Sequence, residues 1–263
     1  MTRDLRTTFE QAPDLYDRAR PRYPDAVFDD LAELAGLLSG ARVCEVGCGT
    51  GQASLPLAER GYRLTCVELG TQLATVAARK LGPFSNAEVV NADFETWRPE
   101  TGEFDAVVAF TSFHWLDPAV RYAKPVSLLR PGGALAVVAT HHVLPADGDP
   151  FFVSVQEDYE AILPDDPKTA EGPPPQPDAI GDLAEEIAAT DLFHNVGARR
   201  YVWDVTYTAD EYIDVLSTYS GHRALDEERR RALFERIRRR IGARPGGRVR
   251  KTYLALLNVA RSR

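Results

Sequence analysis

The sequence predicts an α/β protein, a doubly wound and mostly parallel sheet with helices on both faces. Three observations lead to this expectation. Short apolar runs typical of buried strands alternate with segments whose apolar residues recur at helical spacing. Three glycines stand at alternate positions directly after the first apolar run. The last apolar segment, 249–259, is long enough for a strand that returns antiparallel to the others.

The elements follow in order along the chain. Five parallel strands are predicted at 43–46, 63–68, 87–91, 105–110 and 134–140, with a tight turn at 128–133 before the fifth. Segment 200–208 alternates like a further strand. Helices are predicted over 24–38, 53–60, 149–162, 178–192, 209–220 and 225–241. The proline-rich segment 164–177 is expected to be a mobile surface loop without regular structure.

The glycine turn is the most informative motif. Gly47, Gly49 and Gly51 follow a strand and precede a helix, and Glu45 lies two residues before the first of them. Glycine lets backbone approach a ligand closely, and the helix start directs free N–H groups to the same place. The dinucleotide fingerprint G-x-G-x-x-G has its last glycine one residue later, so the spacing favours another nucleoside ligand. Taken alone, the turn could also serve packing.

Acidic residues end the next two strands. Glu68 closes the second strand, 17 residues after Gly51, where a carboxylate can accept hydrogen bonds from both ribose hydroxyls of a nucleoside. The alternative is a solvated acid at a strand end. Asp93 follows the third strand and could accept a hydrogen bond from an adenine amine while Phe94 covers the ring. The alternative for Asp93 is a helix cap, since Glu95 follows it.

These motifs, in this order, resemble class I S-adenosylmethionine-dependent methyltransferases. The resemblance rests on E-x-G-x-G-x-G at 45–51, the strand-end acids and the L-x-P-G-G turn at 129–133. Segments 16–24 and 216–220 resemble a bacterial small-molecule subgroup, distantly similar to trans-aconitate methyltransferase. The resemblance implies a seven-stranded Rossmann-like sheet with an antiparallel C-terminal strand and a helical lid. It also implies S-adenosylmethionine as methyl donor, S-adenosylhomocysteine as product, and no metal.

The resemblance also implies a division of the single domain, 1–263. Residues 1–38 are expected to form an N-terminal helical cap and 39–141 the cofactor-binding half. Residues 142–182 would be a lid or insertion, and 183–263 the helices and strands that complete the sheet. The residues implied for cofactor binding are Tyr16, Arg20, Glu45, Gly47, Gly49, Gly51, Gln52, Glu68, Leu69, Ala92, Asp93, Phe94, Phe110, Thr111 and Phe113.

Tyr16 and Arg20 lie four residues apart on the predicted N-terminal helix and therefore face the same way. In the resembling subgroup this segment closes over the cofactor, which implies that Arg20 pairs with the methionine carboxylate and Tyr16 caps the site. The alternative is a surface helix with solvated arginines at Arg18, Arg20 and Arg22.

His114 is the candidate catalytic residue because it follows the fourth strand, where the methyl group should lie. A general base is needed when the acceptor is a hydroxyl, an amine or an acidic carbon. The alternative is a ring that packs beside Trp115 and shapes the pocket. Trp115, His141 and His142 are the expected substrate contacts. The methyl transfer itself is expected to be an in-line SN2 displacement.

The composition of the chain limits which substrates and which cellular location are expected. The net charge of the 263 residues is −8, from 31 basic and 39 acidic residues, which argues against a nucleic acid substrate. Cys44, Cys48 and Cys66 fall in or beside predicted strands, as core residues of a reducing compartment would. No apolar run approaches the roughly 18 residues of a membrane span, so a cytoplasmic protein is expected. The arginine run 229–240 alternates with acids and predicts a solvated helix face.

The expected function is therefore methyl transfer to a small organic molecule, of the kind found in bacterial specialised metabolism. Two alternatives stay open. A nicotinamide-dependent oxidoreductase could use the same sheet, although the early third glycine argues against it. A non-catalytic protein that senses S-adenosylmethionine could have the same motifs. The sequence sets neither the acceptor atom nor the oligomeric state.

Overall fold

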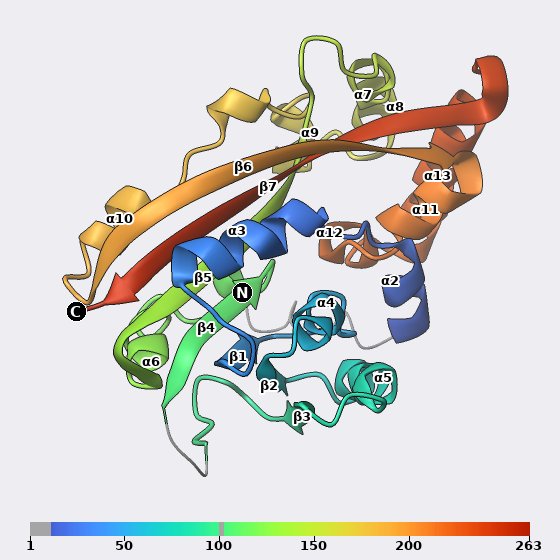
Figure 1. Cartoon of the computed structure of the whole chain (residues 1–263). Coiled ribbons are helices and arrows are strands. Elements are labelled where there is room, and N and C mark those ends of the chain that lie inside the picture. Colours follow the sequence, from blue (N-terminus) through green and yellow to red (C-terminus); the bar gives the residue numbers. More distant parts are fainter. Residues whose placement is uncertain (1–11, 100–102) are drawn as a thin grey trace.

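A computed structural model describes residues 12–99 and 103–263 and contains one seven-stranded sheet (Figure 1). The strands lie in the order β3-β2-β1-β4-β5-β7-β6. The first five strands of the chain are parallel, and β7 runs antiparallel to both of its neighbours, as predicted. Their bounds are β1 Arg42–Val46, β2 Arg63–Glu68, β3 Ala87–Asn91, β4 Phe104–Phe110, β5 Leu129–Val143, β6 Phe193–Thr208 and β7 Arg248–Ser262.

Helices cover both faces of the sheet because its central strands are apolar on both sides. One face packs on α3, α4 and α5, and the other on α6 and α10. A third cluster joins α7, α8, α11 and α13 beside one end of β6 and β7. The longer helices are α2 Pro13–Ala19, α3 Asp25–Ala35, α4 Ser54–Glu59, α5 Thr71–Leu81, α8 Gln156–Ile162, α11 Ala209–Leu216 and α13 Glu227–Gly242; the shorter ones are α6 Ala123–Val126, α7 Phe151–Ser154, α9 Pro167–Ala170, α10 Ala184–Ala188 and α12 Ser220–Arg223.

The fifth strand begins earlier than predicted. β5 starts at Leu129, so the Pro-Gly-Gly segment lies inside the strand and not before it. Phe104 pairs with Leu129 whereas Ala106 pairs with Ala134, so the extra residues of β5 form a bulge in the ladder. Gly132 has a φ of 72° there, which a residue with a Cβ rarely adopts. The sixth strand is also longer, because β6 starts at Phe193.

Three predicted helices end early, start late or divide at an extended residue. The helix predicted over 24–38 ends at the left-handed Gly36, which leaves Leu38 79% exposed and outside the apolar stripe. In 178–192 only Ala184–Ala188 is α-helical, and the Ala184 N–H at its start donates to the Asp182 carboxylate at 2.8 Å. The helix predicted over 209–220 divides into α11 and α12, and Tyr219 between them is extended.

The proline-rich segment 164–177 is not free of regular structure. It contains α9, and a short 3₁₀ turn begins at its end, Pro177–Ala179. The Leu144 N–H donates to the Pro175 carbonyl at 2.9 Å, so the segment is tied to the end of β5. The helix predicted over 149–162 is present as α7 followed directly by α8. Within the described ranges, no helix has the length and apolar character needed to cross a bilayer.

Candidate active site

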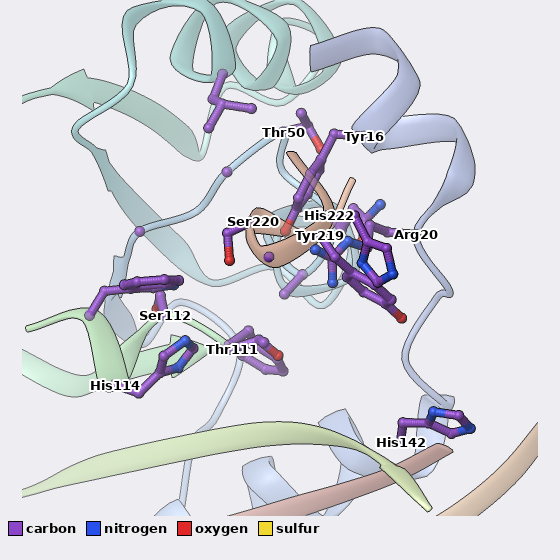
Figure 2. Close-up of a pocket in the computed structure, with 18 of the residues that line it drawn as sticks. Tyr16, Arg20, Thr50, Thr111, Ser112, His114, His142, Tyr219, Ser220 and His222 are labelled. Atoms are coloured by element: carbon purple, nitrogen blue, oxygen red, sulfur yellow. The ribbon is translucent and has the colours of Figure 1, made fainter. Parts of the chain in front are cut away.

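A pocket with a volume of about 1040 Å³ opens at the carboxyl ends of β1, β2 and β4. Parallel α/β sheets place their ligands in this position, where loops from several strands meet. Figure 2 shows Thr111, Ser112 and His114 on one side of the pocket and Tyr16, Arg20, Tyr219 and His222 on another. The pocket therefore joins the sheet's strand ends to segments from both ends of the chain.

The glycine turn forms one wall. Gly47 and Gly49 both have positive φ angles, 63° and 58°. The Gly47 N–H donates to the Val67 carbonyl at 2.8 Å, which ties the turn to β2. A Cβ built on Gly49, which lines the pocket, would meet none of the described atoms within 4 Å. The turn thus leaves an open space in front of its backbone, large enough for a ligand to approach.

Glu68 is buried at the end of β2, so the alternative of a solvated acid is wrong. Its Oε2 accepts the Gly49 N–H and its Oε1 accepts the Gly70 N–H, both at 2.8 Å. These bonds fix the carboxylate beside the glycine turn. Each carboxylate oxygen has a second lone pair that can accept a ligand hydroxyl.

Glu45 lies deeper in the same wall and is almost fully buried. Burial raises the pKa of this carboxyl to about 8, although the hydrogen bond from Ser54 Oγ at 2.5 Å lowers it in part. Glu45 therefore retains a proton up to near neutral pH and adds little negative charge to the pocket.

Asp93 makes the local contact that the sequence offered as its alternative role. Its Oδ1 accepts the Glu95 N–H at 3.0 Å in the turn after β3. Ala92, Asp93 and Phe94 nevertheless all line the pocket, and the Phe94 side chain is buried. The two roles are compatible, because the turn holds Asp93 at the pocket wall.

The N-terminal helix α2 lies against the glycine turn. Thr50 Oγ1 donates to Asp17 Oδ1 at 2.9 Å, and Gln52 Nε2 donates to the Asp17 carbonyl at 3.2 Å. The Arg20 guanidinium lies between two rings, 4.8 Å from the centroid of Tyr16 and 4.5 Å from that of Tyr219. Its Nη2 donates to the Thr218 carbonyl, whereas its buried Nε has no partner among the described residues. Arg20 is therefore part of the pocket and not a solvated surface arginine.

His114 and Trp115 lie side by side, with ring centroids 4.7 Å apart, and both line the pocket. Burial lowers the pKa of His114, and the neighbouring His141 lowers it further. The imidazole is therefore uncharged at neutral pH, a state that suits either a base or a wall of the pocket.

Of the two neighbouring histidines in β5, only His142 lines the pocket. Successive residues of a strand point to opposite faces, so His141 and His142 could not both reach it. The His142 ring packs edge-on against Phe152 at 4.4 Å. Burial, with a smaller contribution from Lys251, lowers the pKa of His142 to about 2. Its Nε2 is buried and has no hydrogen-bond partner in the part of the chain that the structure describes.

Two residues predicted to bind the cofactor do not line the pocket. Gly51 faces α5, where an added Cβ would come within 3.5 Å of Ala77. The Phe113 ring packs on Tyr122 with centroids 5.2 Å apart, in the core on the other side of the short 3₁₀ turn Phe113–Trp115. These two residues lie behind the pocket wall, because adjacent residues of a turn cannot all face the same cavity.

Sequence reasoning missed a large part of the pocket wall. Tyr23 donates or accepts a hydrogen bond with Thr111 at 2.9 Å, and Thr111 itself has a positive φ of 54°. The remaining wall comes from distant segments for which the sequence gave no motif, apart from the similarity at 216–220. These additional lining residues include Phe152, Val155, Gln156, Tyr159, Leu163, Tyr212, Tyr219, Ser220 and His222.

Comparison with known proteins agrees with this geometry. A model of the methyltransferase domain family matches residues 43–133. An uncharacterised methyltransferase of Mycobacterium tuberculosis is 31% identical over 140 residues, 52% of this chain and 53% of the relative. One of Geobacillus kaustophilus is 30% identical over 149 residues, 53% of this chain and 68% of the relative. The chain spans about half the length of the first curated relatives it matches.

Solved structures share the fold. A candidate type II methyltransferase from Anaeromyxobacter dehalogenans has a TM-score of 0.64 at 23% identity and covers 92% of this chain and 97% of its own. A methyltransferase from Geobacter sulfurreducens in complex with S-adenosyl-L-homocysteine has a TM-score of 0.51 at 13% identity, over 93% of each chain. The chain belongs to the class I S-adenosylmethionine-dependent methyltransferases.

Proposed function

We propose that the protein transfers a methyl group from S-adenosylmethionine to a small organic acceptor. The observation that carries this proposal is one pocket that is lined by two different groups of residues, and we call the parts beside these groups its two chambers. The first chamber contains the glycine turn and the buried carboxylate of Glu68, and the second is lined with aromatic rings. A methyl donor and an acceptor need adjacent sites from which water is excluded.

The first chamber fits S-adenosylmethionine. Glu68 would accept the ribose hydroxyls, Asp93 the adenine amine, and Phe94 would cover the adenine ring. The buried, unpartnered Nε of Arg20 would donate to the methionine carboxylate, with Tyr16 over it. When bound, S-adenosylmethionine supplies a methyl group on a positively charged sulfur. The remaining proposed contacts are Glu45, Gly47, Gly49, Gln52, Leu69, Ala92, Phe110 and Thr111, all of which line the pocket.

The second chamber would hold the acceptor. Trp115 and His142 are the proposed acceptor contacts, and the unpartnered Nε2 of His142 offers a hydrogen bond. The size of the pocket suits a small molecule, and a net charge of −8 does not favour nucleic acid. Catalysis without a metal and a cytoplasmic location belong to the same proposal.

His114 is proposed to contact the acceptor beside the end of β4. It is uncharged and lines the pocket, so it can accept a proton or form a wall. A pH–rate profile of a His114 variant separates these two roles, because only loss of a base would remove a rise of the rate with pH.

Calorimetry tests the cofactor. S-adenosylmethionine and S-adenosylhomocysteine should bind without added metal, and NADH should not compete. Binding of NADH with no response to S-adenosylhomocysteine would show an oxidoreductase instead. A screen of small-molecule acceptors, with detection of released S-adenosylhomocysteine, then tests turnover. A protein that binds both ligands but turns over none of a broad panel would be a sensor.

A further inference from the structure

A lysine is buried behind the acceptor chamber. Lys251 lies in β7, in a stretch whose residues are nearly all buried, and is only 1% exposed. Four rings surround its ammonium group, with centroids between 5.0 and 6.0 Å away: Phe152, Tyr212, Tyr219 and Tyr253. Three of these rings, those of Phe152, Tyr212 and Tyr219, line the pocket. Lys251 therefore lies one layer behind the wall that an acceptor would touch.

Tyr219 connects this lysine to the chamber. Lys251 Nζ donates to Tyr219 Oη at 3.1 Å, the one hydrogen bond of this amine within the described ranges. The Arg20 guanidinium lies 4.5 Å from the centroid of the same ring. In Figure 2 the hydroxyl of Tyr219 points to the side of the pocket on which His142 lies. Tyr219 is thus a phenol in the pocket wall with two cations against it.

The two positive charges of this cluster, on Lys251 and Arg20, call for a negatively charged group nearby. A buried ammonium without a counter-charge is costly, and cation–π contacts offset only part of that cost. No carboxylate lies within ion-pair distance of Lys251 in residues 12–99 and 103–263. Ionisation of Tyr219 would supply the missing negative charge. Burial alone raises the pKa of Tyr219, but Lys251 and Arg20 outweigh it and hold that pKa below its usual value. Burial lowers the pKa of Lys251 in turn.

We propose that Tyr219, as a phenolate paired with Lys251, is the proton acceptor of the reaction and that the acceptor substrate is an aromatic hydroxyl. This inference rests on the proposed methyl transfer and gives Tyr219 the role that the sequence offered to His114. Lys251 is a positioning residue, because it acts through Tyr219.

The chemistry of the chamber points to a phenol. Phe152, Tyr159, Tyr212 and His142 present ring faces and edges that suit a flat aromatic molecule. A tyrosine oxygen exchanges a proton most readily with a group of similar acidity, and phenols share its pKa of about 10. An aliphatic alcohol is far less acidic. The free Nε2 of His142 offers a second hydrogen bond to the substrate oxygen.

The step balances. The oxygen–hydrogen bond of the substrate breaks as its oxygen forms a bond to the methyl carbon, and the donor sulfur keeps the electron pair of the bond that is lost. The proton passes to Tyr219 Oη, which becomes a neutral hydroxyl beside the Lys251 ammonium. One positive charge leaves the sulfur while one negative charge leaves Tyr219, so the net charge of the pocket is unchanged.

The ionisation of Tyr219 can be measured without any substrate. A titration that follows tyrosinate absorbance should show one of the ten tyrosines ionising at lower pH than the others. Tyr219→Phe should remove this signal, and Lys251→Met should move it to higher pH. Tyr207→Phe is the matched control, because burial raises the pKa of Tyr207 to about 12 and it lies outside the pocket. A low-pH signal that survives Tyr219→Phe, or no such signal at all, would overturn the proposal.

Turnover then tests the role. With a panel of substituted phenols, release of S-adenosylhomocysteine should fall by roughly 10²–10⁴ in Tyr219→Phe, while calorimetry shows unchanged S-adenosylhomocysteine affinity. The wild-type rate should rise with pH as Tyr219 ionises, and Lys251→Met should shift this rise to higher pH. Wild-type protein that binds S-adenosylhomocysteine but methylates amines or aliphatic alcohols and no phenol would refute this inference and leave the proposed function standing. If the wild-type protein did not bind S-adenosylhomocysteine at all, that result would instead refute the proposed function.

Discussion

The two chambers of the pocket are built in different ways. The cofactor chamber is made mainly from strand ends within residues 45–116, and each of its motifs is a strand followed directly by a loop. The acceptor chamber combines β5, α7, α8, α11, α12 and the residues before α13, with Lys251 of β7 behind it. The first chamber is therefore a local product of the chain, whereas the second depends on long-range packing.

The chambers also differ in charge. Glu68 and Asp93 lie in the cofactor chamber, whereas Arg20, at the border between the chambers, and Lys251, on the acceptor side, both contact Tyr219. Carboxylates suit the hydroxyls and amine of a nucleoside, and cations suit carboxylates and phenolates. If the two chambers act separately, a substitution in one chamber should leave the function of the other unchanged.

Gly49→Val should have the largest effect and should be confined to the cofactor chamber. The side chain would enter the open space of the pocket, and the φ of 58° is strained for a branched residue. We expect S-adenosylhomocysteine affinity to fall at least ~100-fold by calorimetry, or about 3 kcal/mol. Gly132→Val is the control, because Gly132 has a φ of 72° outside the pocket. Normal affinity in Gly49→Val would show that the turn is structural only.

Glu68→Ala should follow, since it removes the acceptor proposed for the ribose and releases two loop N–H groups. We expect binding to weaken by about 1.5–3 kcal/mol, the cost of lost hydrogen bonds to a charged group. Glu88→Ala is the control, because Glu88 is exposed on the neighbouring strand β3. An unchanged dissociation constant in folded Glu68→Ala would exclude this residue from the site.

Arg20→Met tests whether Arg20, which lies between the two chambers, contacts the methionine carboxylate of the cofactor. Loss of the guanidinium should weaken S-adenosylhomocysteine roughly tenfold, as expected for one charge-assisted hydrogen bond. It should leave 5′-methylthioadenosine, which lacks the methionine carboxylate, bound as before. Arg18→Met serves as the control, because the Arg18 side chain is 66% exposed. Equal weakening of both ligands would place Arg20 away from the carboxylate.

His114→Ala should have the smallest effect on binding. We expect cofactor affinity and melting temperature to fall slightly together, with a pH–rate profile of unchanged shape. A base must be unprotonated, so a rate controlled by His114 would rise with pH through its pKa. Burial lowers that pKa, which would place the rise below pH 6.5. Loss of such a rise in the variant, with affinity intact, would make His114 the base and contradict the role of Tyr219.

The sequence was sufficient to predict most of the residues that line the first chamber because its motifs are local. Glycines that need positive φ, and an acid at a strand end, can be recognised from a few neighbouring residues. Errors arose where the facing of a single residue mattered. Gly51, Phe113 and His141 belong to segments that form the pocket, but they do not line it. A turn or strand distributes neighbouring side chains over different faces, and the sequence alone did not fix which residue faces inward.

The acceptor chamber could not be predicted in the same way. Its walls meet only after β5, β6 and β7 pair, and their segments lie up to about a hundred residues apart. One signal was nevertheless present, since Lys251 alternates with the apolar residues Val249 and Tyr253 and therefore shares their face of the strand. A lysine inside a buried strand is unusual unless it has a partner. Its partner, Tyr219, stands where the predicted helix 209–220 divides, and the helix prediction concealed that break.

The pairing of β7 with β5 limits how this family member can change over evolutionary time. The register between the two strands is continuous from the pair of Ala134 with Arg261 to the pair of Val143 with Thr252. Deletion of one residue from this part of β7 would break the alternation and turn Lys251 to the opposite face, away from Tyr219. Only an insertion or deletion of two residues would keep Lys251 on the face of the strand that contacts Tyr219. New acceptor specificities should therefore arise by point substitution along β7, and by insertions only in segments outside the ladder, such as 164–177.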